Sequence, residues 1–469
     1  MPTNSVIGGS DYIVTGTDYI IGGTDYIITV TDYRISRHSY LFMPIQISFL
    51  VAGMHCSLYF VVRVKLWLSV VYLSDSLYFC ANYNTVCNMI QENFIKIYEG
   101  SFKKNWELPA LTDYSKGTTF SFADVAKEIA RIHILFEECQ IRRGDKIALI
   151  GKDSARWCIV YMAAVTYGAI IVPILQDFSP NDVHHIINHS ESVFLFVSDR
   201  IWDTLEEEMI EDVRGVFSLS DFRCLHQRDG ESIQKLLKGM DEKMAEKYPN
   251  GFGKDDIKYA ELDNDKVVLL NYTSGTTGFS KGVMLTGNNL AGNVMYGIEL
   301  GVLYRGEREL CFLPLAHAYS CAFNFLVPMA VGAHVYLLGK VPSPKILLKA
   351  FEEVKPNLIL TVPLILEKIY KKRILPQLSK TTMKVALNIP LLDSRIYAQI
   401  RKKLVDAFGG RFREVIVGGA AMNEEVTNFL YKIKFPFTIG YGMTECGPLI
   451  SYDPVSYTHL RAHETGAYL

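Results

Sequence analysis

The sequence predicts an α/β protein in which mainly parallel sheets are flanked by helices. Two observations support this class. Short apolar strands alternate with amphipathic helical stretches through the middle of the chain, and glycine-rich loops directly follow several of the strands. In open parallel sheets such loops lie at the carboxyl ends of the strands, where ligands bind. We therefore expect a ligand site at a strand edge.

The first part of this pattern lies between residues 122 and 173. Apolar residues recur three or four positions apart from Phe122 to Phe136, which is the spacing of one buried helix face. Strand, helix and strand then follow in the order that predicts a parallel pair joined by a crossover helix. The predicted elements are a helix over 122–136, a strand over 146–150, a helix over 154–167 and a strand over 169–173.

The pattern continues toward the end of the chain. Further short apolar runs predict strands over 193–197, 267–270, 334–338, 357–362 and 414–417. Val426, Phe429, Leu430 and Ile433 share one helix face and are expected in the core. Residues 230–265 are rich in Lys, Asp and Glu with sparse apolar positions, which predicts a solvated surface helix that leads into a loop.

Composition narrows the function classes. The chain has 469 residues with 48 basic and 50 acidic side chains, so its net charge of −2 does not favour a nucleic-acid partner. The nine cysteines are scattered and form no C-x-x-C pair, which is typical of unpaired thiols in a reducing compartment. We expect a cytoplasmic protein, and a peripheral contact with the inner membrane face stays open.

Residues 1–88 differ from the rest of the chain and form a doubtful N-terminal extension. A seven-residue repeat over 8–36 is filled with Gly, Thr and β-branched residues, which excludes a coiled coil. A small β repeat or a translated DNA repeat fits better. The uncharged run 41–62 is long enough to cross a bilayer, but Pro44, Gln46 and His55 within it disfavour a transmembrane anchor.

The credible part of the chain lies between these ends. From Met89 the composition becomes that of an ordinary enzyme, so Met89 is our candidate for the biological start and 89–454 for the large domain. Residues 455–469 follow abruptly and carry no apolar period, and we expect a non-native tail there.

The strongest motif is VVLLNYTSGTTGFSKGVM over 267–284, an apolar strand that ends in hydroxyls, glycines and a lysine. Glycines let the backbone approach a polyanion, while hydroxyl and main-chain N–H groups donate to phosphate oxygens. The loop is not a Walker motif, because two residues separate Gly278 from Lys281 and no Ser or Thr follows the lysine. The stretch predicts a nucleoside triphosphate site.

Thr273–Val283 resembles the phosphate loop of the adenylate-forming superfamily, which includes acyl-CoA synthetases, luciferases and peptide-synthetase adenylation domains. Ser280 stands where proline is more usual, which loosens the turn but leaves the phosphate donors in place. The resemblance assigns nucleotide binding to Thr273, Ser274, Gly275, Thr276, Thr277, Gly278 and Lys281.

Two further stretches extend this resemblance. FLPLAHAY over 312–319 is similar to the motif whose histidine borders the acyl pocket, here His317. VIVGGAAM over 415–422 and IGYGMTECGP over 439–448 are similar to the loops that hold the adenylate. By resemblance, Gly419, Ala420 and Ala421 wall one face of the adenine, Tyr441 stacks on the other, Thr444 binds the α-phosphate and Glu445 holds Mg²⁺. The catalytic set implied is Thr273, Lys281, His317, Thr444 and Glu445.

The resemblance covers about 89–453 and implies ATP-dependent activation of a fatty acid to an acyl-adenylate and then, with CoA, to a thioester. It is closest to long-chain fatty-acid:CoA ligases. The family's ribose, hinge and late-lysine motifs are missing, so we expect the small C-terminal domain to be absent, ATP binding to be weak and thioester formation poor. Two alternatives stay open: adenylation of an aryl or amino acid, and an inactive nucleotide-binding fragment.

Overall fold

The computed structural model describes residues 92–452, except 211, 229, 274–280, 381–385, 387, 388, 390 and 391, together with six earlier strands. The chain divides into two compact units, Met1–Asn88 and Met89–Leu469. The predicted tail 455–469 and the predicted phosphate contacts Ser274–Gly278 lie outside the described residues.

The first unit contains strands on the repeat and on the apolar run. β1 (Tyr12–Val14) pairs with β4 (Tyr33–Ile35), while β2 (Asp18–Ile20), β3 (Tyr26–Thr29), β5 (Leu41–Val51) and β6 (Met54–Val64) form an antiparallel sheet. The apolar run 41–62 therefore falls on two paired strands. Among the described residues, no helix has the length and apolar character needed to span a membrane.

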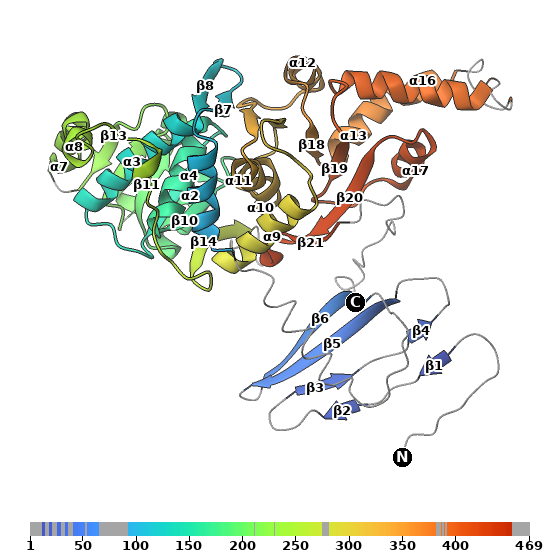
Figure 1. Ribbon diagram of the computed structural model, residues 1–469, viewed down its shortest axis with the longest axis horizontal. Helices are drawn as coiled ribbons and strands as arrows, with labels where there is room; N and C mark the ends of the chain where they lie inside the picture. Colours follow the sequence, from blue (N-terminus) through green and yellow to red (C-terminus); the bar gives the residue numbers. More distant parts are fainter. Residues whose placement is uncertain are drawn as a thin grey trace. The chain divides into compact units, whose positions relative to one another are not determined.

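The second unit is built on two sheets, which lie at the left and the right of the upper part of Figure 1. One has seven strands in the order β13 (Cys224–Gln227), β12 (Gly215–Ser218), β11 (Ser192–Val197), β9 (Lys146–Ile150), β10 (Ile170–Ile174), β14 (Val267–Thr273) and β15 (Lys281–Thr286). The other has eight, β21 (Leu449–Tyr452), β20 (Phe437–Gly442), β19 (Glu414–Val417), β18 (Leu358–Thr361), β16 (Arg308–Cys311), β17 (His334–Leu337), β7 (Pro109–Asp113) and β8 (Thr118–Ser121).

Both sheets follow the same plan. Their inner strands pair in parallel, and the strand at each edge, β13, β15, β21 or β8, pairs antiparallel with its neighbour. The predicted class, mainly parallel sheets flanked by helices, is confirmed. Because inner strands of one sheet point the same way, the loops that follow them gather at one edge of that sheet.

The two sheets share one apolar core. α4 (Ala155–Tyr167) contacts β9 and β10 of one sheet and β7 of the other. Residues on every side of α4 are buried, as expected for a helix surrounded by protein. Trp157 and Tyr161 of this helix stack on each other. Both pack edge-on against Phe325, which lies between β16 and β17 of the eight-stranded sheet in the sequence. The sheets are thereby held as one body.

Helix starts follow from local sequence. Ser121 and Asp124 form a reciprocal capping box at α3 (Phe122–Glu138), Ser179 and Asp182 form one at α5 (Pro180–His189), and Thr286 caps α9 (Gly287–Glu299). Each cap satisfies backbone N–H groups that have no partner within the helix. The cap of α9 matters most here, because Thr286 also ends β15 and so fixes where strand becomes helix.

The described residues of this unit also form further helices. They are α2 (Phe94–Lys104), α6 (Asp199–Trp202), α7 (Ser232–Lys238), α8 (Met240–Lys247), α10 (Ala318–Ser320), α11 (Val327–Val331), α12 (Pro344–Val354), α13 (Pro363–Ile369), α14 (Leu375–Leu378), α16 (Leu392–Ala407) and α17 (Glu424–Lys432). Two π-helical turns, η3 (Cys321–Leu326) and η4 (Tyr370–Ile374), and three 3₁₀ turns, η1 (Glu207–Met209), η2 (Lys254–Asp256) and η5 (Thr444–Cys446), lie between them.

The predicted elements over 122–173 and the five later strands are confirmed, with ends shifted by up to a few residues. The prediction for 230–265 needs a correction. Its charged side chains are mostly exposed, but the segment forms α7 and α8, which contact α3. The predicted surface helix is thus two short helices, and its sparse apolar residues Ile233, Met240 and Met244 are buried where the segment packs on the protein.

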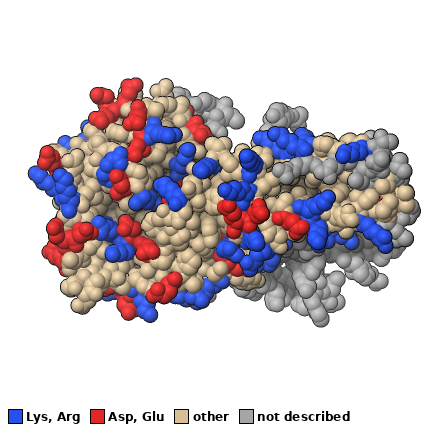
Figure 2. All heavy atoms as spheres, turned by 90° about the horizontal axis from the view of Figure 1, so that it is seen from above, with Lys and Arg blue, Asp and Glu red and all other residues tan. Residues whose placement is uncertain are grey.

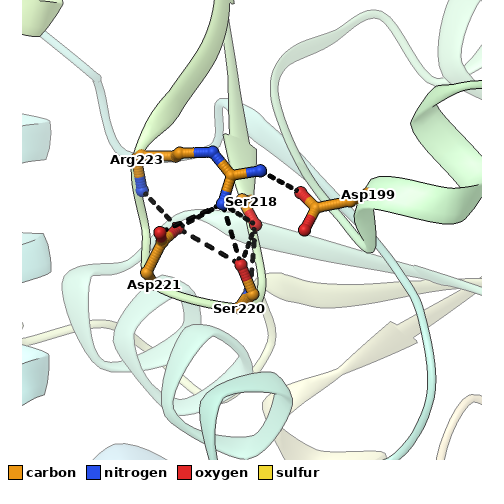
Figure 3. A network of polar contacts seen from close by, with 5 residues as sticks. All are labelled: Asp199, Ser218, Ser220, Asp221 and Arg223. Atoms are coloured by element: carbon orange, nitrogen blue, oxygen red, sulfur yellow. Dashed lines mark hydrogen bonds and ion pairs between the residues drawn. The ribbon is translucent and has the colours of Figure 1, made fainter.

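Charged surface side chains form ion pairs and hydrogen bonds with their neighbours. On the left part of the face in Figure 2, acidic and basic side chains are interspersed. Figure 3 shows one example, in which Arg223 donates to Asp199, Asp221 and Ser220 around the turn between β12 and β13. This network holds the antiparallel edge strand β13 against the parallel part of the sheet.

Candidate functional site

The loops after β19 and β20 lie side by side at the edge of the eight-stranded sheet. Val417 pairs with Ile439 in the register of these parallel strands, so the segments that follow them begin level with each other. Gly419, Ala420 and Ala421 follow β19, and Tyr441, Thr444 and Glu445 belong to the end of β20 and the turn η5. All are exposed except Thr444, which is half-buried. Sequence-distant motifs are thus brought together on an open surface.

The β14–β15 hairpin carries the described ends of the predicted phosphate loop. Thr273 ends β14 and pairs with Lys281, the first residue of β15. The Lys281 side chain is exposed, and Thr273 is half-buried. The hydroxyl and the ammonium group therefore lie on paired residues at one end of the hairpin.

A buried asparagine joins this hairpin side to the second sheet. Asn293 of α9 donates to the carbonyl oxygen of Cys446 at 3.3 Å, and its own Oδ1 accepts from the N–H of Leu449 at 2.8 Å. Gly447 lies against the same helix, because a Cβ there would come within 2.9 Å of the Asn289 carbonyl oxygen. β15 also contacts η5. Thr444 and Glu445 are therefore held beside the hairpin that carries Lys281.

The histidine segment is anchored between the same two parts. His317 immediately precedes α10, and the neighbouring carbonyl of Ala316 accepts from the buried Asn271 side chain of β14 at 3.0 Å. Two residues further on, the Tyr319 hydroxyl donates to the Ile416 carbonyl at 3.1 Å. A Cβ on Gly418 would lie 3.0 Å from the Tyr319 ring, so only glycine fits there without a shift.

His317 itself keeps contact with solvent, although surrounding protein atoms displace part of its water. That desolvation lowers the pKa of His317, and the negative charge of Asp177 opposes the shift. The imidazole is consequently neutral at physiological pH. A neutral ring beside the site can donate one hydrogen bond and accept another without adding charge.

A cavity of about 450 Å³ lies next to this histidine segment. Loops that follow strands of both sheets line it, including 152–153 after β9, 176–177 after β10 and 311–314 after β16. Its wall is mainly apolar, from residues such as Phe312, Leu347, Phe351 and Ile365, and three lysines also line it, Lys152, Lys340 and Lys368. Val362, another lining residue, comes within 3.7 Å of where a Cβ on Gly419 would lie. The cavity therefore adjoins the adenylate loops.

One carboxyl in the cavity wall is strongly perturbed. Burial raises the pKa of Asp153 to about 7, even though it accepts a hydrogen bond from the N–H of Leu315 at 3.0 Å, which acts in the opposite direction. Leu315 lies two residues before His317, so its hydrogen bond to Asp153 holds the start of the histidine segment in place. Its charge will change near neutral pH, with the charged form gained as the pH rises.

The predicted metal ligand can be tested against its surroundings. Among the described residues, no group of three or more His, Cys, Asp or Glu side chains could hold a metal ion. Glu445 is an exposed single carboxylate beside the hairpin. Mg²⁺ bound to nucleotides typically uses one or two carboxylates together with substrate phosphates and water. The residues therefore fit a metal that arrives with the nucleotide rather than a preformed all-protein site.

Sequence reasoning missed several residues that shape this region. Asn271, Tyr319 and Asn293 position the motifs through hydrogen bonds. Asn271 and Tyr319 lie within the quoted motifs, but the sequence did not indicate these contacts, and Asn293 lies outside every motif. The cavity lysines are dispersed over three loops and could not be grouped without coordinates.

Two sheets with motif-bearing loops at their carboxyl edges define the fold of adenylate-forming enzymes. Comparison of structures agrees: the solved N-terminal domain of FACL13 from Mycobacterium tuberculosis matches with a TM-score of 0.56 at 19% identity, over 76% of this chain and 77% of that one. The model of the family described as AMP-binding enzyme matches residues 99–467. The chain belongs to the AMP-binding enzyme family.

Curated relatives come from several organisms. Long-chain-fatty-acid–CoA ligase 1 of Saccharomyces cerevisiae is 24% identical over 394 residues, which is 76% of this chain and 56% of the yeast protein. 4-Coumarate–CoA ligase CCL1 of Humulus lupulus is 26% identical over 350 residues, 73% of this chain and 56% of the plant protein. The chain thus spans little more than half the length of these relatives.

Proposed function

We propose that this site activates a fatty acid with ATP to an acyl-adenylate, which then reacts with CoA. The observation that carries the proposal is the meeting of three sequence-distant motifs at one place. The hairpin ends Thr273 and Lys281, the His317 segment and the η5 turn are tied to one another through Asn271 and Asn293. The names of the yeast and other relatives support a carboxylic acid as the second substrate.

In this proposal ATP lies along the edge from η5 to the hairpin. Tyr441 stacks on the adenine, with the backbone of 419–421 on its other face. Thr444 binds the α-phosphate, while Thr273 and Lys281 contact the outer phosphates together with Ser274, Gly275, Thr276, Thr277 and Gly278. Glu445 holds the Mg²⁺ that accompanies the nucleotide, and the bound ion neutralises phosphate charge.

The chemistry proceeds by two displacements. A carboxylate oxygen of the acid attacks the α-phosphorus in line as the bond to pyrophosphate breaks, and this leaves an acyl-adenylate. The CoA thiol then attacks the acyl carbon, loses its proton, and AMP departs with the bridging oxygen. Negative charge on the phosphate oxygens changes position during the first step, so the donors at Thr444 and Lys281 act by orientation and electrostatic stabilisation.

The lysine-lined cavity suits CoA better than the acyl chain. Lys152, Lys340 and Lys368 offer positive charge for phosphates, and the apolar wall suits the uncharged arm of CoA. A fatty acid has its only charge at the reacting end, so the three lysines, which outnumber the two aspartates of the same wall, would have no counterpart on its tail. We therefore assign the cavity to part of CoA.

A second candidate is an aryl acid, because one relative is a 4-coumarate–CoA ligase. The test is acid-dependent ATP–pyrophosphate exchange by the whole chain, with palmitate, 4-coumarate and amino acids compared. We expect exchange with the fatty acid, and a fall of about 10²- to 10³-fold in Lys281→Ala and Glu445→Ala, as for the loss of a transition-state donor. Lys266→Ala, an exposed lysine just before β14, is the matched control. Exchange that is equal in all four proteins would overturn the site assignment.

A further inference from the structure

Tyr272 lies between the nucleotide hairpin and a helix that carries none of the motifs. It is the residue before Thr273 in β14, and only 4% of it is exposed. Its ring belongs to an apolar cluster with Val183, Ile186 and Ile187 of α5. The hairpin therefore packs on α5 through Tyr272, one residue before Thr273, which is proposed to contact phosphate.

A hydrogen bond fixes this contact. The Oη of Tyr272 and the Nδ1 of His189, the last residue of α5, are 2.7 Å apart, and the imidazole tautomer decides which atom donates. The two rings meet edge to face, with centroids 5.8 Å apart and planes at 86°. Because the tyrosine is buried, its hydroxyl would lose its partner if His189 were removed.

The other strand of the hairpin is drawn to the same ring. Gly282 pairs with Tyr272 across the hairpin, and a Cβ on Gly282 would lie 3.1 Å from the ring carbon Cζ. The ring therefore lies directly against the β15 backbone. The next pair along is Thr273 with Lys281, so the tyrosine contacts both strands one residue before the two predicted phosphate contacts.

The preceding residue anchors the opposite face. Successive strand residues point to opposite sides of a sheet, and Asn271 accordingly reaches the Ala316 carbonyl rather than α5. The hairpin end is thus held from one side through the histidine segment and from the other through Tyr272. Neither Tyr272 nor His189 belongs to the site derived above, and both lie one residue or one hydrogen bond away from it.

We propose that His189 and Tyr272 are a positioning pair for the nucleotide site, which sets the spacing of Thr273 and Lys281 for the phosphates of ATP. This inference rests on the proposed function. A pair that positions only the hairpin end should affect ligands that carry the outer phosphates, and should leave ligands that lack them unaffected. That distinction separates positioning from a general loss of stability.

The experiment measures the affinity of the whole chain for MgATP and for adenosine by equilibrium titration, with a melting curve for every variant. Tyr272→Phe and His189→Ala each remove the hydrogen bond, and we expect MgATP affinity to fall about five- to tenfold, as for one lost hydrogen bond, with adenosine affinity unchanged. His189→Asn, which keeps a polar atom near the position of Nδ1, should restore most of the affinity. Asn181→Ala, at an exposed position on the same helix, is the control and should match the unmodified chain.

The outcomes separate the two levels of the proposal. If the unmodified chain binds neither MgATP nor adenosine, the proposed function itself fails. If it binds both, and the variants keep the same ratio of MgATP to adenosine affinity, the positioning pair is refuted whether or not the variants melt earlier. An unchanged ratio includes an equal loss of affinity for both ligands, which is what a structural defect alone produces.

Discussion

Glu309 offers a direct test of burial in the middle of the eight-stranded sheet. It lies in β16, the middle of the eight-stranded sheet, with Val335 and Leu358 opposite it on the two neighbouring strands. The residue has no exposed surface, and neither carboxyl oxygen has a hydrogen-bond partner among the described residues. Burial raises its pKa well above the ordinary value of 4.5. The folded chain therefore holds Glu309 as the neutral acid.

The sign of the pH effect follows from that shift. Above the ordinary carboxyl range the unfolded chain releases this proton, while the folded chain retains it. Glu309 therefore lowers the free energy of unfolding by about 1.4 kcal/mol for each pH unit, until the pH reaches its pKa in the folded state.

Glu309→Gln should remove this cost, because the amide has a similar shape and stays uncharged. We expect the melting temperature of the variant, relative to that of the unmodified chain, to rise as the pH is raised from 5 to 8, at roughly 2 °C per kcal/mol for a chain of this size. Glu352→Gln, the same change at an exposed position, should show no such divergence. Parallel melting temperatures of Glu309→Gln and the unmodified chain at every pH would refute the reasoning.

Further predictions concern the site. Lys368→Glu should raise the KM for CoA at least tenfold without changing acid-dependent pyrophosphate exchange, whereas Lys349→Glu, which lies on α12 outside the cavity wall, should change neither. An unchanged KM for CoA would remove the cavity from the CoA path. Asn271→Ala leaves the buried Ala316 carbonyl without its donor and should cost about 1–3 kcal/mol of stability, measured by denaturant unfolding. Gly418→Val should displace the Tyr319 ring and weaken adenylate binding, and a crystal structure with the ring unmoved would contradict this.

Much of the fold could be predicted from sequence because local patterns determined it. The helix face from Phe122 to Phe136 and the short apolar strands around it reproduce their periods directly in α3, β9 and β10. The charged segment with α7 and α8 could not, since Met240 and Met244 are too sparse to mark a face until α3 is placed against them.

For the site too, local patterns could be predicted from the sequence and contacts between distant residues could not. Continuous motifs, such as Thr273 with Lys281 or Tyr441 with Glu445, are visible in the sequence because their residues are neighbours in the chain. The contacts that join these motifs are not visible in the sequence, because each depends on a single polar side chain that is distant in the chain from the residue it contacts. His189 lies 83 residues before Tyr272, and no local pattern distinguishes it from another surface histidine.

We expect the edge formed by η5, the β14–β15 hairpin and the His317 segment to bind an acyl-adenylate. The most direct measurement is calorimetric titration of the whole chain with a non-hydrolysable acyl-sulfamoyl adenosine that carries a long acyl chain. We predict saturable one-to-one binding, and a loss of about tenfold or more in Tyr441→Ala, which removes the aromatic face proposed for the adenine. No binding, or binding that Tyr441→Ala leaves unchanged, would contradict the account.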